Sequence, residues 1–241
     1  MKIALLLTGH ARLWVSQRTY EGIKTALLDH HDVDIFISTW SIDNLGRAKG
    51  TADWAEPMPI NLEDYIQLFQ PKKIHIEDHY KFYANRFPNI ELLERPEDVF
   101  KVNSHAAAHG SWWLERLRDQ WYMVKQGWDL IDNPEQYDII IRSRSDSYLE
   151  PFDFQTDNLV VPDRKVDGWQ NWSVCDLMAY GPPAMMEKYC TMFDHMESMY
   201  VNDNVNIVHA DEVLGIYLKK YCGITPTLKD IPFHWSLHHP T

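Results

Sequence analysis

The chain has 241 residues, of which 45% are hydrophobic and 13% aromatic, and its net charge is −12. This length and apolar content suffice for a sizeable buried core, as one large domain or two halves, so we expect a folded globular protein. The acidic balance argues against a general nucleic-acid binder, because neutralising phosphates requires a basic surface, although a local arginine site remains compatible.

The cysteines and the apolar run near the N-terminus indicate the cellular compartment in which we expect the protein. Cys175, Cys190 and Cys222 are scattered and lack the CxxC spacing, so we expect neither a disulfide framework nor a thiolate zinc site, and a reducing compartment fits best. The apolar run from Ile3 to Leu7 is too short for a signal-peptide core or a membrane span. We therefore expect a cytoplasmic protein without a transmembrane segment.

Strand-like and helix-like segments alternate along the first part of the chain. Residues 2–7 predict a buried strand, and residues 15–28 predict a helix with one apolar face. Residues 34–40 predict a second buried strand that ends in polar residues. Residues 41–60 lack periodicity and predict a long loop, a kind of segment that is often functional.

The next segments continue the alternation. Asn61 predicts the cap of a short helix that Pro71 ends, and residues 73–77 alternate as a half-exposed strand. Residues 105–131 predict the longest helix. Its apolar stripe consists of Leu114, Leu117, Trp121, Val124, Trp128 and Ile131. A stripe of this length is typical of a helix that covers a sheet, rather than of a coiled coil.

The second half adds three strand candidates and two helices. Ile139, Ile140 and Ile141 predict a central buried strand, and residues 159–162 and 174–180 predict two more. Gly181-Pro182-Pro183 opens a helix with a core-facing methionine stripe. Residues 209–222 predict the last helix, which Gly223 is well placed to end. No internal repeat or linker is evident, so we predict a single α/β domain with a mixed sheet.

The most informative segment follows the three isoleucines. Arg142, Arg144 and Asp146 come where the strand ends and share one side of an extended chain. Ligands of open α/β sheets bind beyond the carboxyl ends of the strands. There an arginine pair suits phosphate, and a carboxylate suits a hard divalent cation. A structural salt-bridge cluster explains the same residues equally well.

Acids and histidines late in the chain admit two interpretations. Asp211 and Glu212 lie in the first turn of the last predicted helix, where carboxylates favour the helix dipole and commonly do nothing else. The histidines of the tail, His234 among them, could ligate a metal, but their spacing is a weak signal.

Four blocks together give the chain a resemblance to a family. They are residues 5–12 (LLLTGHAR), 34–40 (DIFISTW), 137–146 (YDIIIRSRSD) and 176–181 (DLMAYG). In this order they resemble GT-A-like glycosyltransferases found among bacterial surface-polysaccharide genes and in large viruses and phages. The resemblance implies a single GT-A-like, Rossmann-like domain over 1–241. Its nucleotide-binding part would cover about 1–150 and its acceptor-side part about 151–241.

The resemblance also implies a function. It implies transfer of a sugar from a nucleoside-diphosphate-sugar donor to a glycan acceptor, in surface-polysaccharide or glycoprotein glycan synthesis. The turn after the first strand, with Thr8 and Gly9, would approach the nucleotide, and Arg12 would be available to a phosphate or base. The alternative interpretation of Arg12 is a surface charge at a helix start.

The metal motif departs from the family pattern. Arg144-Ser145-Asp146 occupies the place of the family's Asp-x-Asp motif, which binds Mn²⁺ or Mg²⁺ on the donor diphosphate, and Arg144 replaces the first acid. Either Asp146 alone holds the ion, with water and phosphate oxygens, or Arg142 and Arg144 stabilise the leaving diphosphate directly. His234 could complete a metal site, as a late histidine does in several GT-A enzymes.

An inverting transfer needs a base for the acceptor hydroxyl. The family commonly takes it from an acid near the start of a late helix, which here means Asp211 or Glu212, with Glu212 slightly favoured. Asp176 is a competing acid that could instead hold sugar hydroxyls, or be a buried carboxylate bonded to the backbone.

Two alternatives to a glycosyltransferase remain. A sugar nucleotidyltransferase is disfavoured because no glycine-rich phosphate loop with a following lysine comes after the first strand. A catalytically silent protein that binds nucleotide or glycan stays open because the first acid of the metal motif is missing.

Overall fold

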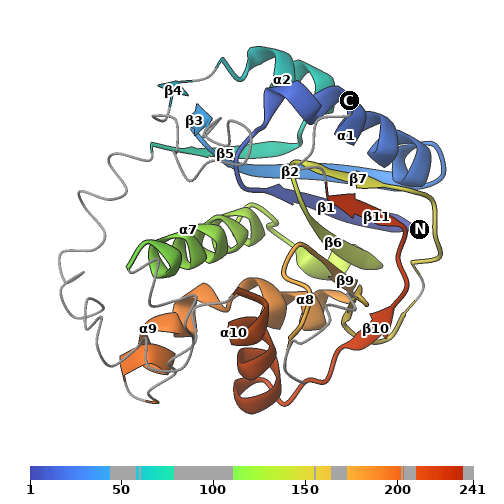
Figure 1. Ribbon diagram of the computed structural model, residues 1–241. Coiled ribbons are helices and arrows are strands. Elements are labelled where there is room, and N and C mark those ends of the chain that lie inside the picture. The colour runs from blue at the N-terminus through green and yellow to red at the C-terminus, as the bar shows by residue number, and fades with distance from the viewer. Residues whose placement is uncertain are drawn as a thin grey trace.

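The computed structural model describes residues 1–43, 58–59, 61–78, 111–154, 156–163, 173–201, 203 and 210–235. A seven-stranded sheet lies between two layers of helices (Figure 1). The chain therefore has the predicted α/β architecture.

The sheet has the strand order β10-β8-β9-β6-β1-β2-β5. In chain order its strands are β1 (Lys2–Thr8), β2 (Asp32–Trp40), β5 (Lys73–Glu77), β6 (Ile139–Arg144), β8 (Val160–Pro162), β9 (Met178–Gly181) and β10 (Thr227–Lys229). β1 pairs in parallel with both β2 and β6, β2 with β5, and β10 with β8, whereas β9 is antiparallel to β6 and β8. The prediction of a mostly parallel mixed sheet is confirmed.

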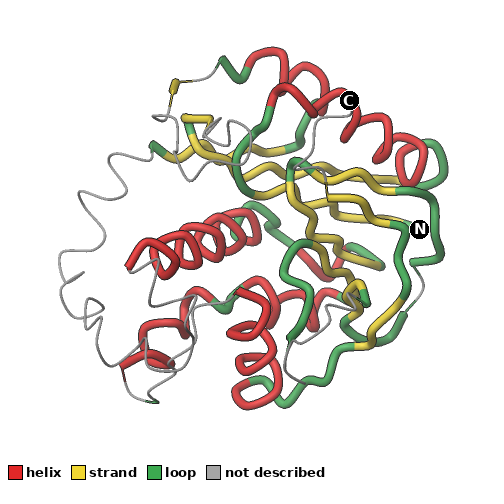
Figure 2. Tube along the Cα trace, viewed as in Figure 1, coloured by secondary structure: helices red, strands yellow, loops and turns green. Residues whose placement is uncertain are grey.

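Helices cover both faces of this sheet (Figure 2). One face carries α1 (Leu13–Ile23), which continues as the π-helical turn η1 (Lys24–Leu28), and α2 (Glu63–Phe69). The other carries α7 (Ser111–Trp128), α8 (Pro183–Cys190), α9 (Phe193–Val201) and α10 (Ala210–Ile216), which continues as the π-helical turn η3 (Tyr217–Tyr221).

Alternation along the central strands divides the interior into two cores. Ala4, Leu6 and Ile140 join the core under α7, α8 and α10, and Leu5 and Ile141 join the core under α1 and α2. All five side chains are fully buried. Because successive residues of a strand point to opposite faces, one continuous apolar run supplies both cores.

Short elements complete the described chain. β7 (Ser147–Leu149) pairs antiparallel with β11 (Phe233–Trp235), β3 (Ile42–Asp43) pairs with β4 (Met58–Pro59), and η2 (Pro134–Gln136) is a 3₁₀ turn before β6. Thus part of the region predicted as a loop over 41–60 pairs as two-residue strands, and its remaining residues, apart from Ser41, lie outside the described ones.

Several predicted boundaries change. The helix predicted over 105–131 is described from Ser111 and ends at Trp128; residues 105–110 lie outside the described part. The helix after Pro182 divides into α8 and α9, and the strand predicted over 174–180 spans only Met178–Gly181. Among the described residues, no helix combines the length and apolar character needed to cross a bilayer.

Candidate functional site

The predicted site residues from the first strand lie at the carboxyl edge of the sheet. Thr8 ends β1 and is in register with Arg144 at the end of β6. Gly9 follows with φ of +108°, a conformation that side-chain-bearing residues rarely adopt. Its N–H donates to the carbonyl of Ser38 at 3.1 Å. This turn leads the chain into α1, with Arg12 as the residue before the first helical turn.

Asp146 lies in the turn between β6 and β7 and is held by two arginines. Arg144 donates from Nε to Oδ1 at 2.8 Å and from Nη2 to Oδ2 at 2.7 Å, which is a bidentate pair. Arg12 Nε lies 3.0 Å from Oδ2. The carboxylate is 2% exposed, whereas the Arg144 and Arg12 side chains are 22% and 20% exposed. Parts of both arginine side chains therefore reach solvent, whereas the carboxylate does not.

Electrostatics favour the charged state of this cluster. Burial by itself raises the pKa of Asp146, but Arg144 and, to a smaller extent, Arg12 lower it, and the resulting pKa is below the ordinary value. Burial lowers the pKa of Arg144, while Asp146 and then Asp176 raise it, with a net upward shift. Asp146 is thus an anion at neutral pH, and Asp176 lies within electrostatic reach of Arg144.

Arg142 forms the floor of the site. It is 1% exposed. Its Nε donates to Thr8 Oγ1 at 3.0 Å, and its Nη1 donates to the backbone carbonyl of Asp176 and, at 3.4 Å, to the hydroxyl of Tyr189. The prediction that Arg142 faces a ligand is not supported by this position, because these partners are protein groups that connect β1 to the segment before β9.

Asp176 is fixed from two further helices. Its Oδ2 accepts a hydrogen bond from Gln120 Nε2 of α7 at 2.8 Å, and its carbonyl accepts one from the Tyr189 hydroxyl of α8 at 3.5 Å. The residue is 9% exposed. The carboxylate is buried, as the alternative expectation has it, and its Oδ2 is held by an amide side chain.

Asp211 and Glu212 open α10 but differ in surroundings. Ser173 Oγ donates to Asp211 Oδ2 at 2.8 Å, and the Glu212 N–H donates to Asp211 Oδ1 at 3.1 Å. Burial, and secondarily the charge of Asp176, raise the pKa of Asp211 against the lowering effect of these hydrogen bonds. Among the described contacts, Glu212 joins this network through its backbone. The choice between Asp211 and Glu212 as a proton acceptor stays a prediction.

The residues at the carboxyl edge do not fit a divalent cation. Both oxygens of Asp146 are engaged by guanidiniums, and a cation approaching it would meet two positive charges. Within the described part of the chain, no group of three or more histidine, cysteine or carboxylate side chains could hold a metal ion. His234 lies in β11, opposite Tyr148, and its side chain is outside the described residues. A metal role for Asp146 and His234 stays a prediction, and no chemical step below depends on it.

Sequence reasoning missed the residues that support the site. Gln120 and Tyr189 fix Asp176, Ser173 fixes Asp211, and Ser145 donates from Oγ to the carbonyl of His10 at 2.5 Å. Tyr189 lies in the helix for which the sequence predicts only a core-facing methionine stripe. A polar residue beside such a face, as Gln120 is beside Leu117 and Trp121, is the one signal that points to such a role.

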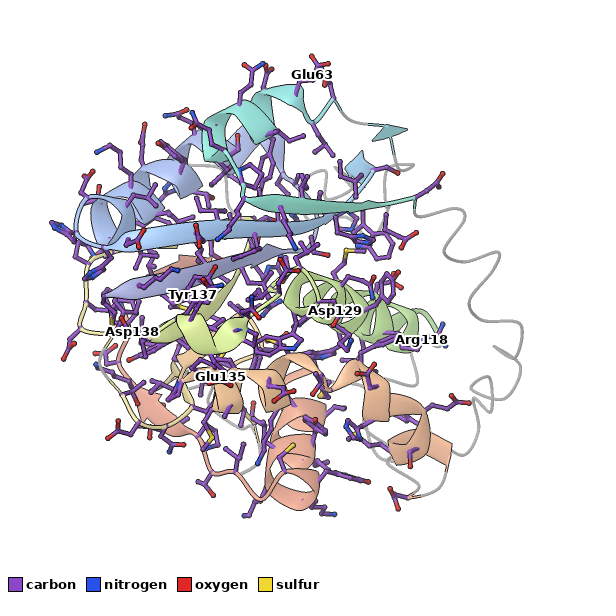
Figure 3. All side chains as sticks on the ribbon, turned by 180° about the vertical axis from the view of Figure 1, so that it is seen from behind. Glu63, Arg118, Asp129, Glu135, Tyr137 and Asp138 are labelled. Atoms are coloured by element: carbon purple, nitrogen blue, oxygen red, sulfur yellow. The ribbon has the colours of Figure 1, made fainter. Side chains whose placement is uncertain are left out.

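A hollow lies near the amino ends of β2 and β5, away from the carboxyl edge of the sheet. It has a volume of about 250 Å³ and lies between α1, the start of β2 and the segment after α2. Its charged residues are Asp34 and Lys72, which pair at 2.6 Å, and the Tyr137 hydroxyl donates to Asp34 at 2.6 Å. Tyr137 lies where β6 begins (Figure 3). These groups satisfy one another, so we place the functional site at the carboxyl edge instead.

Comparisons with known proteins give a likeness of overall arrangement only. No protein-family model matches the sequence, and no curated protein matches it. The apo form of the glycosyltransferase GlyE of Streptococcus pneumoniae TIGR4 is similar with a TM-score of 0.46 and 10% identity, over 95% of this chain and 45% of that one. Apo mouse xyloside xylosyltransferase 1 is similar with a TM-score of 0.43 and 10% identity, over 95% of this chain and 85% of that one. The chain thus spans less than half the length of GlyE.

Proposed function

We propose that this protein is a GT-A-like glycosyltransferase that moves a sugar from a nucleoside-diphosphate-sugar donor to a glycan acceptor, in polysaccharide or glycoprotein glycan synthesis in the cytoplasm. The observation that carries the proposal is the arrangement at the carboxyl edge. Two arginines with partly exposed side chains, Arg12 and Arg144, lie there. Asp176 lies within electrostatic reach of Arg144 and of Asp211, a half-buried acid whose pKa is raised. The succession of sequence blocks that resembles this family agrees with that placement.

The donor side of the reaction needs positive charge. When the bond between the anomeric carbon and the phosphate oxygen breaks, the electron pair leaves with the diphosphate. Fixed guanidiniums stabilise this developing charge without reorganising during the reaction. Arg12 and Arg144 are suited to the role because Asp146 holds both in place.

The acceptor side needs a base. As the acceptor hydroxyl oxygen attacks the anomeric carbon, its proton passes to a carboxylate. A raised pKa makes a carboxylate a stronger proton acceptor, and Asp211 has one. Asp176 acts on both sides by its charge, since it raises the pKa of Arg144 and of Asp211. In this proposal Asp211 is the catalytic base of an inverting transfer, and Asp176 positions the donor or acceptor sugar.

Donor hydrolysis tests this proposal without knowledge of the acceptor. Purified protein is incubated with UDP-, GDP-, CDP- and dTDP-sugars, and release of the nucleoside diphosphate is followed. Asp211→Asn is expected to lower the rate by about 100-fold or more, the usual contribution of a general base. Glu187→Gln, an exposed position on α8, is the matched control. Nucleotide binding without release from any donor would favour a silent binding protein.

A further inference from the structure

Arg12, Arg144 and Asp146 form a charged cluster in which the arginines and the carboxylate have different exposure. We propose that Arg12 and Arg144 bind the diphosphate of the nucleotide directly, in the place of a divalent cation, and that Asp146 is the positioning residue for both. This inference rests on the proposed function and adds to it the way in which the diphosphate is held.

The first argument is the order of the groups from solvent inward. Asp146 is 2% exposed, and about one fifth of each arginine side chain is exposed. An incoming ligand therefore meets parts of both arginine side chains before it meets the carboxylate. Two guanidiniums contact Asp146, and their positive charges attract a diphosphate and repel a metal ion.

The second argument is the engagement of the carboxylate. A carboxylate that ligates Mn²⁺ or Mg²⁺ needs an oxygen directed at the ion. Here Oδ1 accepts from Arg144 Nε, and Oδ2 accepts from Arg144 Nη2 and lies 3.0 Å from Arg12 Nε. Freeing Asp146 for a metal would leave two guanidiniums without this partner, next to the added cation.

The third argument is that the scaffold holds the arginines where a diphosphate would lie. Arg144 ends β6, and Arg12 enters α1 through the turn at Gly9. The turn is fastened by the Ser145 N–H, which donates to the carbonyl of Thr8 at 3.3 Å, and by Thr39 Oγ1, which accepts from the Ala11 N–H at 3.0 Å. Arg144 gives Nε and Nη2 hydrogens to Asp146, and a guanidinium has five N–H donors in all. An arginine oriented by such a pair is preorganised to bind a phosphate through another edge.

The closing experiment measures binding rather than turnover. Isothermal titration is run with UDP, GDP, CDP, dTDP and inorganic pyrophosphate, each in EDTA and in Mn²⁺. We expect pyrophosphate and one nucleotide to bind with dissociation constants that agree within a factor of about three between the two conditions. Binding in Mn²⁺ alone would overturn the inference and leave the proposed glycosyltransferase intact. Absence of binding to every probe would instead overturn the proposed function, and this inference with it.

Variants assign the binding to the arginines. Arg144→Gln and Arg12→Gln are each expected to weaken binding in EDTA by about 10- to 100-fold, the range for one or two hydrogen bonds to a charged group. Arg12→Gln leaves the bidentate Arg144–Asp146 pair intact, so this variant still tests the inference if Arg144→Gln does not fold. Lys188→Gln, an exposed residue of α8, removes the same charge as a control. Unchanged binding in folded Arg12→Gln would refute the role of that arginine in the site.

Discussion

Two aspartates of the site have opposite relations to stability. Asp146 has a lowered pKa because arginines offset its burial, and Asp211 has a raised pKa because of its burial and the charge of Asp176. The anion of Asp146 therefore stabilises the fold, and the anion of Asp211 opposes it. The surroundings of the two carboxylates thus give them different roles: Asp146 is a structural anion, and Asp211 is the proposed base.

Asp146→Asn is expected to destabilise the protein. The change leaves two guanidiniums facing a neutral group, and because these side chains still reach water we expect a loss of about 3 kcal/mol, the low end for broken buried pairs. A group with a lowered pKa contributes stability above its unfolded pKa, and this contribution disappears as the pH falls through the folded value. Urea unfolding from pH 7 to pH 3 should therefore show a smaller acid loss for the variant. Asp132→Asn, which breaks an exposed pair with Lys73, is the control, with a loss under about 1 kcal/mol.

Asp211→Asn is expected to stabilise the protein at neutral pH. A carboxylate whose folded pKa is raised disfavours the folded state once the pH exceeds that value, and it has no such effect below the unfolded pKa. The gain should therefore be present at pH 7 and absent near pH 3. Chemical unfolding at both values measures it, and an equal change at the two pH values would contradict this interpretation. A loss of turnover together with a gain of stability is typical of residues kept for catalysis.

At the scale of elements, Arg12 directly precedes α1, so the packing of α1 sets where this arginine lies. A Cβ built on Gly22 would lie 2.9 Å from the carbonyl oxygen of Leu149 and 3.0 Å from its nitrogen. α1 thus contacts the backbone of β7, the strand that directly follows Asp146. The contact joins the two segments that carry the charges of the site.

Gly22→Ala is therefore expected to be destabilising. Overpacking against backbone costs about 1–3 kcal/mol, which outweighs the gain of about 1 kcal/mol from alanine in a helix. Thermal unfolding of the variant measures the sum. Gln17→Ala, at an exposed position of α1, should change stability by less than about 0.5 kcal/mol. Higher stability of Gly22→Ala would show that α1 can move away from β7.

The elements that the sequence predicts well are those with their own internal signal. The isoleucines of β6 and the apolar runs of β1 and β2 are continuous, and the stripe of α7 is long, so composition alone identifies them. β7 and β11 have three residues each and form by pairing with each other from distant parts of the chain, so neither has a sequence pattern that predicts a strand. The same holds for the site: Arg144 and Asp146 are visible in sequence, but their pairing with Arg12 depends on the turn at Gly9 and on the register of β1 with β6.

At the scale of the whole molecule, the two cores share their central strands. Leu5 and Leu6 are neighbours in β1 and belong to different cores, as do Ile140 and Ile141 in β6. If one layer of helices detached, it would expose side chains of β1 and β6, and the other layer would still cover the opposite face of the same strands. The single domain over 1–241 stays a prediction, and the shared strands agree with it.

We therefore expect one cooperative unfolding transition. Urea unfolding followed by far-ultraviolet circular dichroism and by tryptophan fluorescence should give the same midpoint, since Trp121 lies in one core and Trp40 in a separate small cluster beside α7. Two separated midpoints would instead divide the chain into independently stable parts. Addition of the bound nucleotide should shift both probes together.

The buried guanidinium of Arg142 has a consequence for the order in which the protein opens. It joins the end of β1 to the segment before β9 through groups in the most deeply buried part of the sheet. Amide protons of β6 should therefore be among the last to exchange with deuterium, and a bound ligand would slow them little further. Protection by ligand should appear instead at the turn from Gly9 to Arg12, where the chain lies at the rim. The strand under the site would then stay closed with or without ligand, and only the turn from Gly9 to Arg12 would respond to ligand binding.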